Sequence, residues 1–204
     1  MTLHILRHGE TEFNRLNIVQ GSGVNSSLNE TGRQQALAFY EFHRDIPFDL
    51  VVTSALQRTH QTVQHFIDAG IPWIQDANIN EISWGDHEGQ PSSPERLVLY
   101  EAMLQQWQSG NLDASLPGGE TARQLGARLE IFMEWLHTRT EKNILICTHG
   151  RTMRAFVTLL KGLPLSAMES IPHHNTGCYI VRYFEGSFAF EKENSIRHLE
   201  GVVG

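Results

Sequence analysis

The chain has 204 residues, and its 16 lysine and arginine residues against 23 aspartate and glutamate residues give a formal net charge of −7 with histidine neutral. This length fits a single domain, residues 1–204, and a hydrophobic fraction of 40% excludes a disordered chain. The acidic balance argues against a general binder of nucleic acid or of anionic membranes. Two cysteines are too few for a disulfide scaffold.

The N-terminal segment has neither the basic start nor the apolar run of a secretory signal, and no window holds 18 consecutive apolar residues. We therefore expect a cytoplasmic protein without a membrane segment. Cys147 and Cys178 lie in apolar runs, so we expect both to be buried free thiols.

Short apolar runs alternate along the chain with longer segments whose apolar residues recur with the helical period. The predicted strands cover residues 3–6, 50–53, 72–74, 143–147 and 177–184, with 188–191 as a hairpin partner of the last. The predicted helices cover residues 29–44, 56–69, 94–108, 121–138 and 151–161. This alternation predicts an α/β fold with a mostly parallel sheet.

Residues 83–119 contain no predicted strand. The helix expected at 94–108 is amphipathic in pattern, and the apolar residues along one side of it are Leu97, Tyr100, Leu104 and Trp107. We interpret residues 83–119 as a small helical cap inserted over one end of the sheet, where it would govern substrate specificity.

Two segments, residues 5–9 and 146–150, are apolar strands that end in the same His-Gly pair. In a parallel sheet the two histidines, His8 and His149, would lie at the carboxyl edge, where open α/β folds bind ligands. The glycine that follows each histidine lets a ligand approach the backbone closely.

The same edge is expected to collect Arg7 and Arg58. Guanidinium groups pair with phosphate oxygens and keep their charge at any working pH, so the edge is predicted to bind inorganic phosphate or a small phosphorylated substrate. Nearby cations disfavour the imidazolium, which makes a neutral His8 a candidate phosphoryl acceptor. Glu81, in a glycine-flanked loop, is a candidate general acid.

Other polar residues have weaker signals. The sequence has no HExxH motif and no cysteine cluster, so we expect neither a metal site nor a cofactor. We interpret the pair His173-His174 as a loop feature and expect residues 173–176 to lie near the pocket. Arg151 and Arg154, three residues apart on a predicted helix, could each reach the site or a surface acid. The sequence encodes no readable oligomeric state and leaves a homodimer open.

Five motifs in one order resemble the signature of the histidine phosphatase superfamily, also called the phosphoglycerate mutase-like family. They are R-H-G-E-T at 7–11 followed by Asn14, S-A-L-Q-R at 54–58, the E-x-x-x-G-x-x-E-G pattern at 81–89, P-G-G-E-T at 117–121 and T-H-G at 148–150. The matches extend from residue 3 to about residue 180, which is most of the chain. One such motif is weak, but five in order are specific.

The resemblance implies a doubly wound sheet flanked by helices on both faces and a metal-independent phosphohistidine mechanism. His8 would be the nucleophile and Glu81 the proton donor to the leaving oxygen. The groups that would hold the phosphoryl group are Arg7, Arg58, His149 and Asn14. Gly150 would also contact the substrate.

The branch of the family is less defined. Residues 20–32 resemble the loop of fructose-2,6-bisphosphatase-like members, which adds Gln20 and Gly21 to the expected substrate-binding residues, although Asn25 and Ser27 depart from the common pattern. Only 35 residues separate Glu81 from Pro117, which resembles the broad-specificity phosphatases more than the longer mutases. A cofactor-dependent phosphoglycerate mutase and a non-catalytic phospholigand-binding protein are the alternatives.

Overall fold

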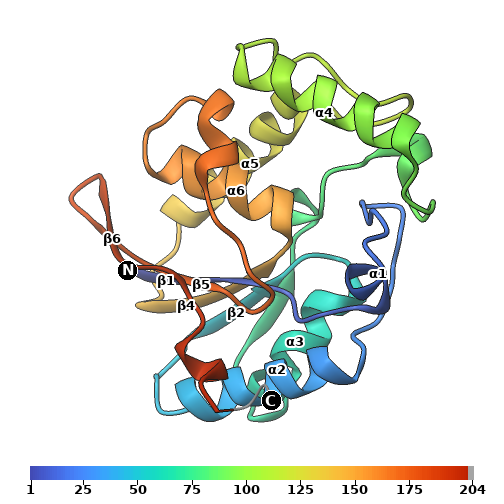
Figure 1. Cartoon of the computed structure of the whole chain (residues 1–204). Helices are drawn as coiled ribbons and strands as arrows, with labels where there is room; N and C mark the ends of the chain where they lie inside the picture. The colour runs from blue at the N-terminus through green and yellow to red at the C-terminus, as the bar shows by residue number, and fades with distance from the viewer. Residues whose placement is uncertain (202–204) are drawn as a thin grey trace.

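The computed structural model describes residues 1–201, and a six-stranded sheet with the order β3-β2-β4-β1-β5-β6 forms its centre (Figure 1). The strands are β1 (Thr2–Arg7), β2 (Leu50–Thr53), β3 (Trp73–Gln75), β4 (Asn143–Thr148), β5 (Cys178–Phe184) and β6 (Ser187–Ser195). The first four are mutually parallel, whereas β5 and β6 are antiparallel to their neighbours. The expectation of a mostly parallel sheet with a terminal hairpin is confirmed.

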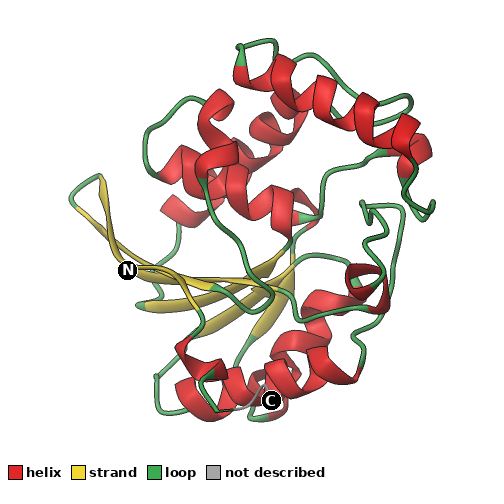
Figure 2. Cartoon of the chain, viewed as in Figure 1, coloured by secondary structure: helices red, strands yellow, loops and turns green. Residues whose placement is uncertain are grey.

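Helices cover both faces of this sheet, with α2 and α3 on one side and α5 and α6 on the other (Figure 2). The α-helices are α1 (Glu12–Arg15), α2 (Glu30–His43), α3 (Gln57–Asp68), α4 (Pro94–Gln108), α5 (Ala122–His137) and α6 (Gly150–Leu160). Short 3₁₀ turns are η1 (Ala77–Ile79), η2 (Gly85–His87), η3 (Leu165–Ser170) and η4 (Arg197–Leu199). Polar N-cap residues mark the beginning of α2, α4 and α5. The side chains of Asn29, Ser93 and Thr121 each accept a backbone N–H from the first turn of the helix that follows.

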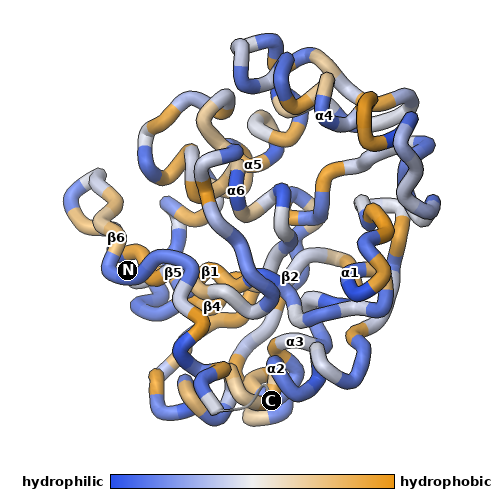
Figure 3. The backbone as a smooth tube through the Cα atoms, viewed as in Figure 1, coloured by the Kyte–Doolittle hydropathy of each residue, from blue (hydrophilic) through white to orange (hydrophobic). Residues whose placement is uncertain are grey.

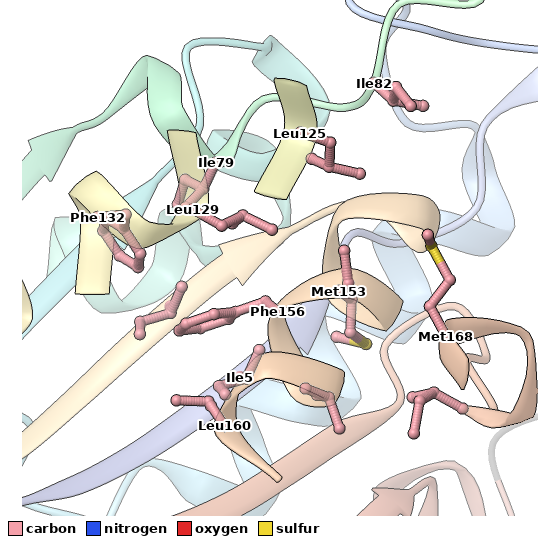
Figure 4. Close-up of a cluster of buried hydrophobic side chains, with 14 of the residues drawn as sticks. Ile5, Ile79, Ile82, Leu125, Leu129, Phe132, Met153, Phe156, Leu160 and Met168 are labelled. Atoms are coloured by element: carbon pink, nitrogen blue, oxygen red, sulfur yellow. The ribbon is translucent and has the colours of Figure 1, made fainter. Parts of the chain in front are cut away.

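Two hydrophobic clusters fill the space between the sheet and its helices. The cluster against α5 and α6 includes Ile5, Leu125, Leu129, Phe132, Met153 and Phe156 (Figure 4). The opposite cluster packs Phe39 and Phe66 against Val51. Figure 3 shows the apolar residues gathered along the central strands. Because these strands are buried on both faces, they are continuous apolar runs, as expected for a parallel sheet.

Both cysteines, Cys147 and Cys178, are buried and free, as expected from their apolar surroundings. Within residues 1–201, no helix is long and apolar enough to cross a membrane.

Helix α4 forms where the sequence predicts it, but the predicted apolar stripe is wrong in part. Leu97 is 49% exposed, and the fully buried side chains are Met103 and Trp107, near the end of the helix. The indole of Trp107 donates a hydrogen bond to the carbonyl of Ala114 at 2.8 Å. Only the second half of α4 therefore packs into the core, so the helical period overestimated the buried face.

Strand register brings the predicted site residues to one edge. β4 lies between β1 and β2, with Arg7 opposite Thr148 and Thr53 opposite Cys147. The backbone N–H of His8 continues this pairing by donating to the carbonyl of Thr148 at 3.0 Å. Three chain segments thus leave the sheet side by side at its carboxyl edge, where α/β folds bind ligands.

Candidate active site

A cavity of about 180 Å³, here called the inner pocket, opens at this carboxyl edge. Its lining includes seven of the nine predicted site residues, which are Arg7, His8, Asn14, Gln20, Arg58, Glu81 and Gly150. The other lining residues are Ile18, Val19, Trp84, Tyr100, Arg151 and His173. Gly21 and His149 lie outside this lining, next to Arg58.

His8 is buried, and its ring orientation is fixed by its neighbour. Its Nδ1 lies 2.7 Å from the carbonyl oxygen of Gly9, so Nδ1 carries the proton and donates it. The lone pair then resides on Nε2. Desolvation, reinforced by the charges of Arg58 and Arg7, lowers the pKa of His8 well below its ordinary value. His8 is therefore a neutral imidazole with a nucleophilic Nε2.

Glycine is required at position 9 by a close backbone approach. A Cβ built there would lie 2.7 Å from the carbonyl oxygen of Gly32, in the first turns of α2. The contact holds the segment after β1 against α2. The sequence motif thus has a steric reason in addition to a chemical one.

Arg58, in the first turn of α3, is fully buried, and each of its guanidinium nitrogens has a partner. Nε donates to Nδ1 of His149 at 3.1 Å, Nη1 to the carbonyl of Val24 at 2.6 Å and Nη2 to the carbonyl of Gly21 at 3.3 Å. Burial lowers the pKa of Arg58 to about 10, so the side chain remains a cation at neutral pH. Gly21 therefore orients a cation through its backbone.

His149 lies one layer behind the inner pocket. Because its Nδ1 accepts from Arg58, its Nε2 carries the proton and donates to Oγ of Ser54 at 2.7 Å. Its ring centre lies 5.2 Å from that of His8. Burial and the charge of Arg58 lower the pKa of His149 well below its ordinary value. The structure gives this histidine a contact that orients Arg58, while direct contact with a phosphoryl group stays a prediction.

Arg7 reaches the inner pocket from the end of β1 and is held by His173. Its Nη1 donates to Nδ1 of His173 at 3.1 Å, and its buried Nε has no partner among the described residues. Burial first, and then the charge of Arg7, lowers the pKa of His173 to about 3, so the ring is a neutral acceptor. The pKa of Arg7 is itself lowered by burial to about 10, which keeps it cationic. The loop position expected for His173 is confirmed.

Glu81 lies at the N-terminus of α6 and is held by that helix. One carboxylate oxygen accepts the backbone N–H of Thr152 at 3.0 Å and that of Ile82 at 3.0 Å. The other accepts the backbone N–H of Arg151 at 3.1 Å. Helix N-termini offer such unpaired amides to carboxylates. The carboxyl group is thereby fixed at the wall of the pocket that also contains His8.

Asn14 and Gln20 are joined through Thr11. Thr11 forms a capping box with Asn14, whose side-chain oxygen accepts the backbone N–H of Thr11 at 3.2 Å. Gln20 donates to Oγ1 of Thr11 at 2.7 Å. Asn175, in the segment 173–176 expected near the pocket, donates to the backbone carbonyl of His8 at 3.0 Å, a contact for which no motif gave a signal.

The wall facing the cap centres on Arg151. Its guanidinium donates to the hydroxyl of Tyr100 at 2.8 Å and pairs with Glu169. It also lies 5.5 Å from the ring centre of Trp84, within the range of a cation–π contact. Arg154 pairs with the same carboxylate at 2.6 Å. Arg151 thus both reaches the pocket and pairs with an acidic residue, the two possibilities that the sequence left open. Sequence spacing gave no signal that Trp84, Tyr100 and Glu169 would contact Arg151.

The chain is similar to known proteins over most of its length. The sequence profile of the histidine phosphatase superfamily (branch 1) matches residues 3–196. A 2,3-bisphosphoglycerate-dependent phosphoglycerate mutase of Brucella melitensis is 32% identical over 173 residues, which is 79% of this chain and 82% of that protein.

Solved structures show the same fold. A putative alpha-ribazole-5′-P phosphatase from Escherichia coli is 25% identical with a TM-score of 0.85, covering 96% of this chain and 97% of that one. The Bacillus stearothermophilus protein YhfR is 29% identical with a TM-score of 0.84, covering 97% and 98%. The doubly wound fold implied by the sequence motifs is confirmed. The chain belongs to the histidine phosphatase superfamily and is an enzyme of the phosphomonoesterase type.

Proposed function

We propose that the protein hydrolyses small phosphomonoesters in two steps through a phosphohistidine on Nε2 of His8. The observation that carries this proposal is the orientation of that ring. The 2.7 Å hydrogen bond from Nδ1 to the Gly9 carbonyl leaves Nε2 unprotonated inside a pocket that also holds two cations, Arg7 and the buried Arg58.

In the first step, Nε2 attacks phosphorus while the bond from phosphorus to the ester oxygen breaks. Glu81 gives its proton to that leaving oxygen, so an alcohol departs. Arg7 and Arg58 hold the equatorial oxygens of the transferring group, where charge is spread in such reactions. The neutral tautomer of His8 makes prior loss of a proton unnecessary.

In the second step, water attacks the phosphorus of phospho-His8. Glu81, which is now a carboxylate, takes the proton of that water, and the phosphorus–nitrogen bond breaks to release inorganic phosphate. Both residues thus return to their starting states. The two arginines supply the positive charge that a metal ion supplies in other phosphatases, so we propose that no metal takes part.

The experiment is phosphate release from p-nitrophenyl phosphate, sugar phosphates, fructose 2,6-bisphosphate and 3-phosphoglycerate, with a chelator present. We compare wild type with His8→Ala and, as a matched control, with His137→Ala, which alters an exposed histidine remote from the pocket. Release by wild type and His137→Ala but not by His8→Ala is expected. Equal rates in all three proteins would overturn the proposal, and no release from any ester would favour a binding role.

A phosphoglycerate mutase is the second candidate, because the curated Brucella relatives carry that name at 32% identity. The same residues would serve, but phospho-His8 would return its phosphoryl group to the bound product. Isomerisation of 3-phosphoglycerate that outpaces phosphate release and depends on a bisphosphorylated primer would establish the mutase.

A further inference from the structure

Next to the inner pocket lies a second cavity of about 300 Å³, here called the outer cavity, which shares Val19 and Tyr100 with it. These two residues line both spaces. The outer cavity lies between the segment that follows α1, the turn η2 and the first half of α4. The outer cavity is therefore the adjoining space for the leaving group of a substrate whose phosphoryl group sits at His8.

The walls of the outer cavity are mainly apolar. Val19, Pro91, Leu97 and the ring of Tyr100 supply this surface. Arg96 lies at the same cavity, where its Nη1 donates to the carbonyl of Pro91 at 3.2 Å. The half-exposed Leu97, which does not fit a core role for α4, fits the wall of a cavity.

His87 is one of the polar residues of this lining, together with Asn17, Gln90, Ser92 and Arg96. It is only 7% exposed, and neither Nδ1 nor Nε2 has a hydrogen-bond partner among the described residues. A buried polar group without a partner costs free energy comparable to a lost hydrogen bond, and such groups are rare in folded proteins. An imidazole can both donate and accept, so a bound hydroxyl or carbonyl would satisfy it.

The position of His87 is fixed by the backbone beneath it. Gly85, at the start of η2, has a φ of +55°, and a Cβ built there would lie 2.1 Å from the carbonyl oxygen of Pro117. The backbone N–H of Asp86 donates to that same carbonyl at 3.0 Å. The turn is thus pinned against the segment before α5, which fixes the backbone that carries the imidazole.

We propose that the leaving group of the substrate spans both spaces and ends against His87. This proposal rests on the proposed function. The substrate class is a phosphomonoester of an alcohol with an extended, largely apolar, ring-bearing body and a hydroxyl or carbonyl near its far end. The apolar body packs against Val19, Leu97 and the ring of Tyr100, and the far polar group pairs with His87.

The arrangement disfavours a short anionic leaving group such as glycerate. Arg151, which donates to the hydroxyl of Tyr100 where the two cavities adjoin, is already paired with Glu169. Arg96, at the outer cavity, donates to the carbonyl of Pro91. An additional carboxylate would have to compete with that ion pair. A substrate that ends at Val19 and Tyr100 would make no contact with the apolar walls of the outer cavity.

The test compares kcat/KM for phenyl phosphate, biphenyl-4-yl phosphate and 4′-hydroxybiphenyl-4-yl phosphate, whose leaving groups are of similar acidity. In the wild type, the second ring raises kcat/KM about tenfold through burial of apolar area. The added hydroxyl raises it about fivefold further, as expected for one neutral hydrogen bond. In His87→Leu the gain from the hydroxyl is lost while the gain from the ring remains, and His87→Gln restores part of it.

A matched pair on α4 tests the path itself. Leu97→Trp fills the outer cavity, so the ratio of kcat/KM for biphenyl-4-yl over phenyl phosphate falls to about one. Leu99, which is 51% exposed on the same helix and lines neither space, serves as the control, and Leu99→Trp keeps the wild-type ratio. Equal ratios in the two variants, or a hydroxyl preference that survives in His87→Leu, would overturn the proposal.

Failure of the proposed function gives a different result. If wild type hydrolyses none of these esters, binding of 4,4′-dihydroxybiphenyl is measured by calorimetry. Binding by wild type that is weakened about fivefold or more in both His87→Leu and Leu97→Trp, but not in Leu99→Trp, supports the outer cavity without catalysis. Unchanged binding in all variants, or no binding by wild type, would overturn it. Thermal unfolding confirms that each variant is folded.

Discussion

The inner pocket and the outer cavity share Val19 and Tyr100 but are built differently. In the inner pocket, Arg58 and Glu81 have hydrogen-bond partners for all their charged atoms, while Nε of Arg7 has none among the described residues. In the outer cavity, neither ring nitrogen of the buried His87 has a partner within residues 1–201. Strand ends and helix N-termini carry the main polar residues of the inner pocket, whereas loops and the first half of α4 carry the residues of the outer cavity.

The difference follows from what each space has to bind. A phosphoryl group has one shape and charge, so its site gains from groups held rigidly before it arrives. A leaving group varies between substrates, and its site can stay unsatisfied until the matching group binds. Changes in the inner pocket should therefore affect all esters, and changes further out should affect them selectively.

The largest effect is expected from Glu81→Gln, which removes the proton donor. Hydrolysis of alkyl phosphates should fall by about 10²- to 10⁴-fold, the usual contribution of a general acid. p-Nitrophenyl phosphate should lose much less, because its leaving group departs without a proton. Steady-state rates for the two ester types measure this contrast, and an equal loss for both would remove Glu81 from the acid role.

Arg58→Lys should lower kcat/KM by about 10²- to 10³-fold, because lysine lacks the fork that meets His149, Val24 and a phosphoryl oxygen at once. The factor should be the same for small and extended esters, as the inner pocket holds only the common group. Arg15→Lys, at an arginine whose side chain is 58% exposed, is the control. A loss of kcat/KM that depends on the size of the leaving group would contradict the assignment of Arg58 to the phosphoryl group alone.

Tyr100→Phe tests the boundary between them. It removes the hydroxyl that accepts from Arg151 at 2.8 Å but keeps the ring that lines both spaces. Arg151 retains Glu169 and its contact with Trp84, so we expect only a roughly two- to tenfold rise in KM. Tyr183→Phe, remote from the pocket, should leave KM unchanged, and a loss confined to kcat would contradict this positioning role.

The smallest effect concerns stability rather than activity, at a site outside both spaces. Burial, with a smaller effect of His43, lowers the pKa of His4 to about 4, and its Nδ1 has no partner among the described residues. In the unfolded chain this group titrates near 6.5. Between pH 6.5 and 4 the unfolded state binds more protons, so this contribution to stability is complete above 6.5 and is lost as the pH falls towards 4.

His4→Phe should remove that component while keeping the packing against Phe48. The free energy of unfolding is measured by urea titration at several pH values. As the pH is lowered from 6.5 to 4, it should fall less steeply in the variant than in the wild type, by a difference in slope that corresponds to at most one proton. Parallel curves for the two proteins would show that His4 does not titrate in this window.

Sequence reasoning placed His8 and His149 at one edge of the sheet because each directly follows a strand. The structure shows that β1 and β4 are neighbouring strands, which brings the two rings to a centre-to-centre distance of 5.2 Å. Sequence reasoning placed His149 at this edge and no more precisely. That His149 lies behind the inner pocket, in contact with Arg58, is known only from the structure. Burial depth depends on side-chain packing that spacing does not encode.

The cap was predicted only as a helix. Its period suggested that Leu97 faces the core, but the fold buries Met103 and Trp107 instead, because only the end of α4 reaches the core. The partners of Arg7 and Arg151, which are His173 and Glu169, belong to segments far along the chain. Such pairings depend on the three-dimensional path of the chain and leave no local pattern.

The central claim, transfer through phospho-His8, is tested most directly by the stereochemistry at phosphorus. A phosphomonoester made chiral by sulfur and isotopically labelled oxygens is hydrolysed in labelled water, and the configuration of the released thiophosphate is determined. Two successive in-line displacements, first by Nε2 of His8 and then by water, predict net retention, whether or not the intermediate accumulates. Net inversion would mean that water attacks the ester directly and would contradict the account.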